Sequence, residues 1–250
     1  MADTALAALI HLHEDAPRQG PGEAAVLDRM IDRLKIGDGA RAADLGCGSG
    51  ATALRLAVAR SFDVLALDAA APFIDRLRAR LKANPPQRGS VEPVIGDMAA
   101  PPVSPGALDL IVSEGAAYSI GFANALKLWR PLVRRGGGLV VSECVWFGAD
   151  RPASARAHWE AGYPGMGSIA DAVARAEAAG WRLVAAERLR AEAWRESYHR
   201  PLAARIAALR AEAASDAALA QAIAEAESEI ALFDATCDAW GYVYLALDAG

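Results

Sequence analysis

The chain has 250 residues, of which 54% are apolar, and a formal net charge of −5. This composition suits one α/β domain, excludes a wholly disordered chain, and argues against a surface that grips the phosphates of nucleic acid. The sequence shows neither a secretory signal nor an apolar run long enough to cross a bilayer, so we expect a cytoplasmic protein with no membrane partner.

Two helices are predicted before the first strand. Thr4 to Leu12 has apolar residues at helical spacing, and we expect His11 and His13 to lie on its polar, solvated edge. The run from Ala16 to Gly22 contains prolines and glycines that interrupt the helix. A second, amphipathic helix is predicted from Glu23 to Leu34.

From Arg41 onward strands and helices alternate, which predicts a parallel sheet with right-handed crossovers. The expected elements are strands at Arg41–Leu45, Asp63–Leu67, Val91–Ile95, Leu108–Ser113 and Leu139–Cys144, and helices at Ala51–Arg60, from Pro72 to about Asn84, and at Phe122–Arg134. Pro131 should shorten the last helix, and the glycines at 136–138 should end it before the fifth strand.

Beyond Cys144 the alternation becomes less regular. The expected elements are helices at Pro152–Ala161, Ser168–Ala179, Pro201–Ala214 and Asp216–Asp238, and strands at Trp181–Arg188 and Tyr242–Leu247. We predict N-caps at Ser168 and Ser215 and a helix stop at Gly180. The glutamates at 225, 227 and 229 should form a solvated helix face.

The stretch from Ala42 to Gly50 gives the strongest functional signal. A short apolar strand passes through three alternating glycines into a helix, so a ligand can lie against bare backbone at the helix N-terminus. Gly46, Gly48 and Ala51 fit the Gly-x-Gly-x-x-Gly/Ala pattern of dinucleotide sites. An ordinary strand-to-helix turn would also use glycine.

Asp44 lies two residues before the first glycine and favours a different ligand. A carboxylate there would repel a pyrophosphate, but it suits the methionyl ammonium of S-adenosylmethionine. We therefore favour S-adenosylmethionine over a dinucleotide. An NAD(P)-dependent oxidoreductase and a non-catalytic S-adenosylmethionine-binding protein remain as alternatives.

Further acids follow the next two strands. Asp68 ends the second strand, where an acid can bind the two ribose hydroxyls or can simply cap the next helix. Asp97 and Met98 follow the third strand. Because ligands bind at the carboxyl ends of parallel strands, three acids at successive strand ends are a more specific signal than any one of them.

The run from Asp44 to Gly50 resembles motif I of class I S-adenosylmethionine-dependent methyltransferases (acid, x, Gly, x, Gly, x, Gly). The segments Pro17–Gly22, Ser113–Phe122 and Ser142–Phe147 resemble a largely uncharacterised group of bacterial small-molecule methyltransferases. This resemblance implies a Rossmann-like, mostly parallel sheet of seven strands flanked by helices. The implied strand order is third, second, first, fourth, fifth, seventh, sixth, with the seventh strand antiparallel. The chain departs from this group mainly in its long alanine-rich helices near the C-terminus, which we expect as helical insertions.

The resemblance also implies contacts with the methyl donor. We expect the glycines to cradle it, Asp44 to contact its amine, Asp68 its ribose, and Asp97 and Met98 its adenine. Arg18 and Gln19 would fold over it from the N-terminal arm. The expected cofactor-binding residues are Arg18, Gln19, Asp44, Gly46, Cys47, Gly48, Gly50, Asp68, Ala69, Asp97, Met98 and Ser113.

The loop that follows the fourth strand would face the methyl acceptor. It lacks the Asn/Asp-Pro-Pro-Tyr/Phe motif of nucleobase amine methylases, so nucleic acid is not expected as a substrate. Glu114 or Tyr118 could position or deprotonate the acceptor, although Glu114 could equally pair with a backbone group. His158 and His199, in an aromatic-rich segment, are further candidate bases.

We therefore predict one methyltransferase domain over residues 1–250, with a helical arm (1–40), a cofactor-binding core (41–145) and substrate-side helices and closing strands (146–250). The predicted reaction is methyl transfer from S-adenosyl-L-methionine to a small molecule (EC 2.1.1.-), releasing S-adenosyl-L-homocysteine. No short Cys/His cluster predicts a metal, and a homodimer remains open as the assembly.

Overall fold

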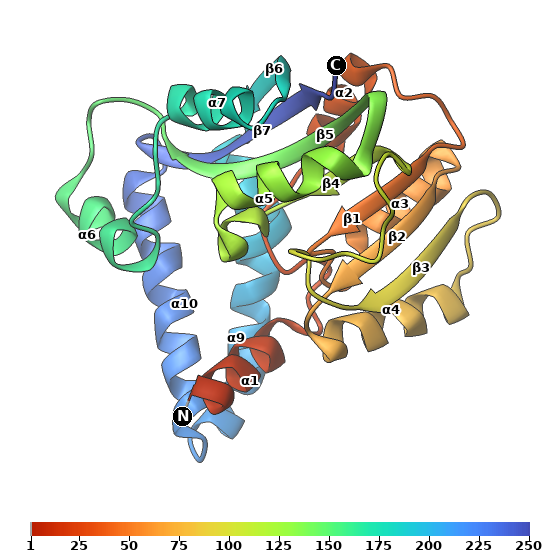
Figure 1. Cartoon of the computed structure of the whole chain (residues 1–250). Coiled ribbons are helices and arrows are strands. Elements are labelled where there is room, and N and C mark those ends of the chain that lie inside the picture. The colour runs from red at the N-terminus through yellow and green to blue at the C-terminus, as the bar shows by residue number, and fades with distance from the viewer. Residues whose placement is uncertain (1) are drawn as a thin grey trace.

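The computed structural model describes residues 2–250, and a twisted sheet of seven strands forms its centre (Figure 1). The strands are β1 (Arg41–Leu45), β2 (Asp63–Asp68), β3 (Ser90–Ile95), β4 (Leu108–Ser113), β5 (Val133–Trp146), β6 (Arg182–Arg188) and β7 (Trp240–Asp248). Their order is β3-β2-β1-β4-β5-β7-β6. The first five strands run parallel, and β7 pairs antiparallel with β5 and β6, which confirms the implied topology.

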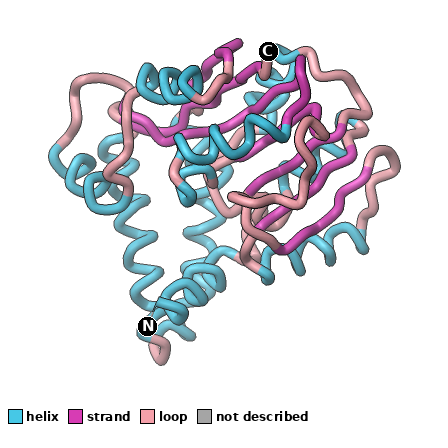
Figure 2. Tube along the Cα trace, in the orientation of Figure 1, coloured by secondary structure: helices cyan, strands magenta, loops and turns pink. Residues whose placement is uncertain are grey.

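Helices cover both faces of the sheet and extend beyond one end of it (Figure 2). The helices are α1 (Ala2–His13), α2 (Ala24–Leu34), α3 (Ala51–Arg60), α4 (Ala71–Ala83), α5 (Phe122–Trp129), α6 (Ala153–Gly162), α7 (Ile169–Ala178), α8 (Ala191–Trp194), α9 (Arg200–Ala213) and α10 (Ala217–Thr236), with the shorter turns η1 (Ala117–Ile120), η2 (Arg130–Leu132) and η3 (Arg195–His199). The fold is thus the predicted α/β class, with an N-terminal helical arm and helical segments inserted near the C-terminus.

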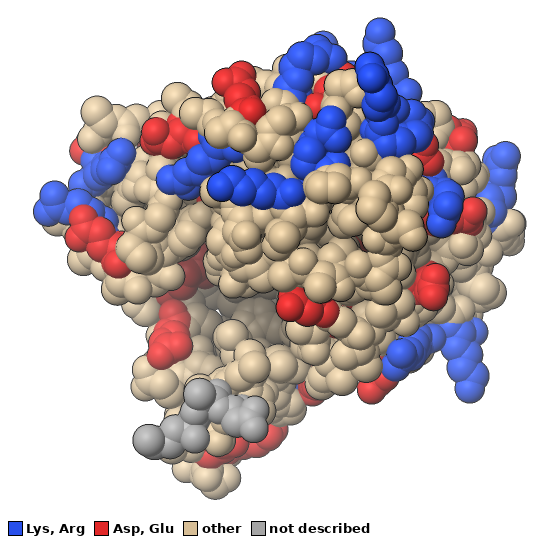
Figure 3. Space-filling model, viewed as in Figure 1, with Lys and Arg blue, Asp and Glu red and all other residues tan. Residues whose placement is uncertain are grey.

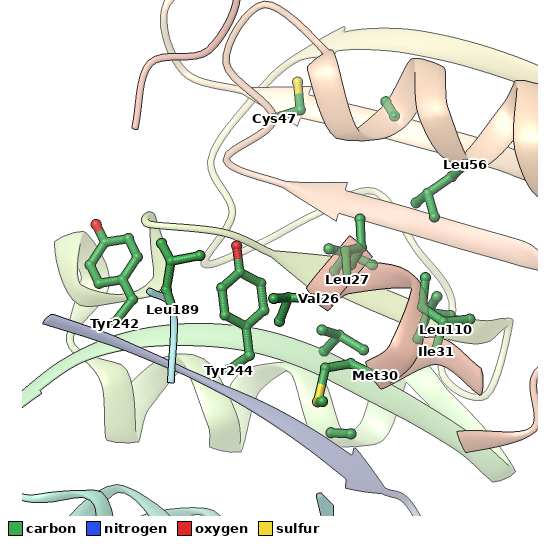
Figure 4. Close-up of a cluster of buried hydrophobic side chains, with 14 of the residues drawn as sticks. Val26, Leu27, Met30, Ile31, Cys47, Leu56, Leu110, Leu189, Tyr242 and Tyr244 are labelled. Carbon is green, nitrogen blue, oxygen red and sulfur yellow. The ribbon is translucent and has the colours of Figure 1, made fainter. Parts of the chain in front are cut away.

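Each face of the sheet has its own apolar core. On one face, α2 and α3 pack on the central strands; Figure 4 shows Leu27 and Met30 of α2 beside Leu110 of β4 and Tyr244 of β7. On the other face, α5 and α7 contribute buried side chains, including the fully buried Trp129. Because both faces are covered, strands such as β4 are nearly continuous apolar runs rather than alternating ones.

A third core lies outside the sheet. Ala8 and Leu12 of α1 pack with Leu202 and Ile206 of α9 and with Leu219 of α10. The start of the chain is therefore held by helices that follow about two hundred residues later, as the lower part of Figure 1 shows. Hydrophobic spacing predicted each of these helices but not which helices pack together.

The predicted bounds of β1, α3 and β4 are confirmed residue for residue. The prediction that glycines 136–138 end a helix is wrong: α5 ends at Trp129, just before Pro131, and the glycines lie inside β5. Gly136 has a φ of 67°, a left-handed backbone that glycine adopts easily, and the pairing of β4 with β5 shifts register between Leu108 and Leu110.

Two predictions near the C-terminus are also wrong. Asp216, not Ser215, caps α10, because its side chain accepts hydrogen bonds from the amides of residues 218 and 219. Glu229 does not face open solvent, since its side chain is 19% exposed and pairs with the buried His199. The sequence analysis also missed α8 and η3, which precede α9.

None of the helices that the structure describes between residues 2 and 250 combines the length and apolar character needed to cross a membrane.

The N-cap of α7 allows a stability prediction. Ser168 accepts a hydrogen bond from the amide of Asp171, whose carboxylate accepts one from the Ser168 amide in return. Replacing Ser168 with Ala should lower the free energy of unfolding by about 1 kcal/mol, since the Asp171 amide loses the side-chain oxygen that caps it. Urea unfolding would measure it. Ser154→Ala in α6, an exposed position with no capping function, is the control and should cost no stability.

Candidate active site

The carboxyl ends of β1, β2, β3 and β4 meet at a cavity of about 650 Å³. Loops after these strands form one wall of it, and α1, η1 and Tyr198 form much of the opposite wall. The segment 18–20, the start of α3 and Phe73 of α4 complete the lining. In Figure 3 a hollow is visible between the sheet and the helices that extend beyond it. Ligands of open parallel sheets bind at this end, so the cavity is the candidate active site.

The glycine turn after β1 forms the floor of the cavity. Gly46, Gly48 and Gly50 have φ values of 79°, 52° and 83°, which only glycine adopts without strain. Asp68 supports the turn: one of its carboxylate oxygens accepts from the Gly48 amide at 2.8 Å, and the other accepts from the Ala70 amide at 2.9 Å. Each oxygen keeps capacity to accept a further hydrogen bond from a ligand hydroxyl.

Gln19 ties the N-terminal arm to the same turn. Its side-chain oxygen accepts from the Ser49 amide at 2.7 Å, and its side-chain nitrogen donates to the carbonyls of His13 and Ala16. A Cβ atom at Gly48 would lie 2.3 Å from that oxygen, so the turn must be glycine for the arm to close on it. Gln19 lines the cavity, where this hydrogen bond fixes it to the glycine turn.

Glu114 is the centre of a buried polar group that we call the Glu114 cluster, comprising Glu114, Arg18, Thr52 and Tyr244. Its side chain is 4% exposed and lies 3.1 Å from the guanidinium of Arg18. The hydroxyls of Thr52 and Tyr244 each donate to one of its oxygens. Glu114 therefore pairs with a cation and two hydroxyls, rather than with a backbone group, and both its oxygens are engaged.

Asp44 lies beside this cluster and has the most perturbed carboxyl of the cavity. Its side chain is buried, and its Oδ2 atom has no hydrogen-bond partner among residues 2–250. Burial, reinforced by the negative charge of Glu114, raises the pKa of Asp44 to about 8, although Arg18 opposes the shift. A buried carboxyl with a free oxygen in a cavity is suited to bind a cationic group.

The remaining predicted cofactor residues divide into two groups. Cys47, Ala69, Asp97 and Met98 line the cavity together with Arg18, Asp44, Gly46, Gly48 and Asp68. Ser113 and Gly50 do not line it. The buried Ser113 hydroxyl donates to the Leu45 carbonyl and joins β4 to β1, while Gly50 caps α3 against Leu77.

The structure separates the candidate bases. Tyr118 lines the cavity with a side chain that is 49% exposed. His158 lies on an exposed face of α6, against Trp159 and outside the cavity, so the structure does not bring it together with the other candidate residues. His199 is buried and bonded to Glu229 and Trp194, also outside the cavity lining.

The sequence analysis missed several cavity residues. His13, expected in solvent, is 7% exposed and lines the cavity, and its ring stacks on Tyr198 with the centroids 5.9 Å apart. Phe73 and Ala116 line it as well. His13 lies shortly before the arm segment that the resemblance placed over the cofactor, and this proximity could have indicated that it lines the cavity. No motif near Tyr198 in the sequence indicated that it would line the cavity.

Across residues 4–250, whose side chains the structure describes, no three His, Cys, Asp or Glu side chains are grouped closely enough to hold a metal ion.

Comparison with known proteins finds a family match in the core of the chain. Residues 42–137 match the family model described as a methyltransferase domain. The chain is similar to methyltransferase domains over this segment. The matched segment runs from β1 into β5 and includes the glycine turn, Asp44, Asp68, Asp97 and Glu114.

Two relatives share the sequence of this domain over about half of the chain. A magnesium-protoporphyrin O-methyltransferase of Rhodobacter capsulatus is 38% identical over 114 residues, 45% of this chain and 46% of the relative. An uncharacterized 37.1 kDa protein in transposon TN4556 of Streptomyces fradiae is 32% identical over 120 residues, 47% of this chain and 34% of the relative. The match thus spans less than half the length of either relative.

The structural likeness of the methyltransferase domain extends further. The S-adenosylmethionine-dependent methyltransferase of Geobacter sulfurreducens, crystallised with S-adenosyl-L-homocysteine, has a TM-score of 0.81 and 18% identity, covering 96% of this chain and 97% of that chain. The match includes most of the N-terminal arm and the C-terminal helices. The predicted fold is confirmed, and the predicted family agrees with the model that matches residues 42–137. The predicted cofactor agrees with the ligand held by that structure.

Gly50 allows a prediction about the turn. A Cβ atom there would lie 2.3 Å from Leu77, which is buried, and the φ of 83° is strained for alanine. Gly50→Ala should lower the free energy of unfolding by about 1–3 kcal/mol in a urea titration. Gly37→Ala is the matched control, since nothing lies within 4 Å of its added Cβ. Equal stability of the two variants would contradict this packing role.

Asp44 allows a prediction about pH. Because its pKa is raised from an ordinary value of 3.8 to about 8 in the folded chain, the folded state retains a proton that the unfolded state has lost. Its contribution to stability therefore falls as pH rises between about 4 and 8. Relative to the parent chain, Asp44→Asn should be more stable at pH 8 than at pH 5.

Urea unfolding at both pH values would measure this difference. Asp38→Asn, at an exposed position, is the control and should show no such pH-dependent gain. A pH-independent effect of Asp44→Asn would mean that the folded carboxyl is ionised over this range.

Proposed function

We propose that the chain transfers a methyl group from S-adenosylmethionine to a small-molecule acceptor. The observation that carries this proposal is the convergence of three acids from successive strand ends on one cavity, above a glycine turn. Asp44, Asp68 and Asp97 all line that cavity, and Asp44 has a buried oxygen without a partner. The Geobacter sulfurreducens structure, which holds S-adenosylhomocysteine, supports the same ligand class.

The residues present fit the donor. The free Oδ2 of Asp44 suits the methionyl ammonium, and a cation there would compensate the repulsion from Glu114. Asp68 would accept from the ribose hydroxyls while it supports the Gly48 amide. Asp97 and Met98 would receive the adenine. When bound, S-adenosylmethionine supplies a methyl group on a sulfonium, which is already an activated donor.

Because the donor is activated, the main task of the protein is to place the acceptor in line with the methyl group. The cavity provides room for this beyond the donor residues, where η1, α1 and Tyr198 form its walls. Glu114 is fully engaged in its cluster, so it positions the arm rather than removing a proton. Tyr118 remains the candidate that the sequence analysis named for contact with the acceptor.

A small molecule is the proposed acceptor. The Rhodobacter capsulatus relative is named as an O-methyltransferase of magnesium protoporphyrin, a small molecule, and this supports the proposal by analogy. The net charge of −5 and the acids around the cavity do not favour a nucleic acid.

Calorimetric titration tests the proposal directly. We expect S-adenosylhomocysteine to bind the chain and NAD to bind at least about a hundredfold more weakly. The methionyl ammonium can pair with Asp44, whereas a pyrophosphate would find no unpaired cation among the cavity-lining residues that the structure describes. Tighter binding of NAD would favour the oxidoreductase alternative. Release of S-adenosylhomocysteine from the donor in a broad metabolite screen then separates catalysis from cofactor binding alone.

A variant tests the ribose assignment. Asp68→Ala removes a charged acceptor and the support of the Gly48 amide, so affinity for S-adenosylhomocysteine should fall by at least about tenfold. Asp75→Ala, on the exposed face of α4, is the control and should bind like the parent chain. Unchanged affinity in Asp68→Ala would remove the ribose assignment.

A further inference from the structure

His13 and Tyr198 form a pair in the cavity wall that has no part in the donor site described above. His13 ends α1 and Tyr198 lies in η3, far apart in the sequence. The Nε2 atom of His13 lies 3.2 Å from the hydroxyl of Tyr198, and the rings stack with an interplanar angle of 16°. Both residues line the cavity, so a ligand there can reach the pair.

The hydrogen bonds determine which atom of the pair donates and which accepts. The Nδ1 atom of His13 lies 2.9 Å from the Leu9 carbonyl, which can only accept, so Nδ1 holds the proton of the neutral ring. Nε2 is then an acceptor, and the hydroxyl of Tyr198 donates to it. The lone pairs of the Tyr198 oxygen stay available to accept a hydrogen bond from a ligand hydroxyl.

The surroundings keep both groups in these states. Burial lowers the pKa of His13, although the Leu9 carbonyl and Glu229 of α10 act in the opposite direction, and burial raises the pKa of Tyr198. Of the charged groups nearby, Arg205 of α9 pairs with Glu14 and with Asp15, and Glu229 itself pairs with His199 of η3. Glu229 is thus the acid placed to stabilise an imidazolium if His13 takes up a proton.

The cavity walls around the pair are mostly apolar and favour an uncharged acceptor. Leu6, Leu9 and Ile10 of α1 line the cavity with Tyr118 and Ile120, and Leu6 and Leu9 are 55% and 47% exposed. Most of the surface of the hollow in Figure 3 is tan, the colour of residues other than Asp, Glu, Lys and Arg. Among the cavity-lining residues that the structure describes, Arg18 is the only arginine or lysine, and Glu114 pairs with it. A phosphate or carboxylate on the acceptor would find no free cation.

We propose that the methyl acceptor is an uncharged hydroxyl compound with an apolar body, and that its proton leaves through Tyr198 to His13. This inference rests on the proposed methyl transfer. A hydroxyl acceptor follows from the pair itself, because a neutral amine needs no base to attack a sulfonium, whereas a hydroxyl must lose its proton. The apolar body would pack against the side chains of α1 and Tyr118.

The acceptor oxygen forms a bond to the methyl carbon, and the bond from that carbon to sulfur breaks, leaving its electron pair on sulfur. The acceptor proton passes to the Tyr198 oxygen as the Tyr198 proton passes to Nε2 of His13. The products are a methyl ether, the neutral thioether and an imidazolium, so the positive charge of the sulfonium ends on His13 near Glu229.

The experiment begins with the chain loaded with S-adenosylhomocysteine, so that failure to bind this ligand counts against the proposed function and not against the acceptor. Calorimetry then compares a panel of neutral phenols with carboxylated counterparts, such as 2-naphthol with 3-hydroxy-2-naphthoate. We expect the phenols to bind at least about tenfold tighter, because an unpaired buried carboxylate loses hydration without compensation.

Two variants test the proton path in turnover of the best-bound phenol. His13→Gln and Tyr198→Phe should each lower kcat by about a hundredfold, with a much smaller change in KM and unchanged affinity for S-adenosylhomocysteine. The acid limb of the parent pH–rate profile, produced by protonation of His13, should disappear in His13→Gln. His11→Gln is the matched control on the same helix, where His11 pairs with Glu14 and Glu212, and it should behave like the parent chain.

Several outcomes would overturn the inference. They are equal or tighter binding of the carboxylated compounds, no binding or turnover of any phenol by the loaded chain, or a full kcat in both variants. Methylation of amines alone would also overturn it. Loss of activity in His11→Gln to the same extent as in His13→Gln would reduce His13 to a structural residue of α1.

Discussion

The site depends on one buried carboxylate and its three partners. Glu114 at the end of β4 holds Arg18 of the N-terminal arm, Thr52 of α3 and Tyr244 of β7. Removing one partner of a buried charge pair typically costs about 3–5 kcal/mol, so these segments are strongly held together. The arm that Arg18 secures also contains Gln19, which closes on the glycine turn, and the position of α1 follows from both contacts.

The same carboxylate makes the cavity receptive to a cation. Glu114 has its own cation, but its charge still acts on the buried Asp44, and the two acids share only Arg18. The chain therefore keeps an acid in a place that disfavours ionisation. A bound ammonium group would offset the free-energy cost of ionising Asp44. The same buried carboxyl that lowers the stability of the folded chain therefore contributes to the affinity of the site.

The sequence predicted what local pattern and topology determine. Successive βα units gave the strand bounds and the strand ends, and these brought Asp44, Asp68 and Asp97 to one cavity. Predictions from the sequence were wrong where burial depends on contacts between distant segments. His13 was expected in solvent because its helix is amphipathic, and only the packing of α1 on α9 and α10 buries it. His158 is the opposite case. Aromatic residues surround it in the sequence, but in the structure it lies against Trp159 and outside the cavity lining.

The packing of α1 against α9 and α10 has a consequence for biosynthesis. β7, which ends at Asp248, must insert between β5 and β6, and α1 must wait for α9 and α10 before its apolar side is covered. The glycine turn and its acids can assemble from the first half of the chain as it leaves the ribosome. The wall that contains His13 and Tyr198 can close only after α9 and α10 have been translated.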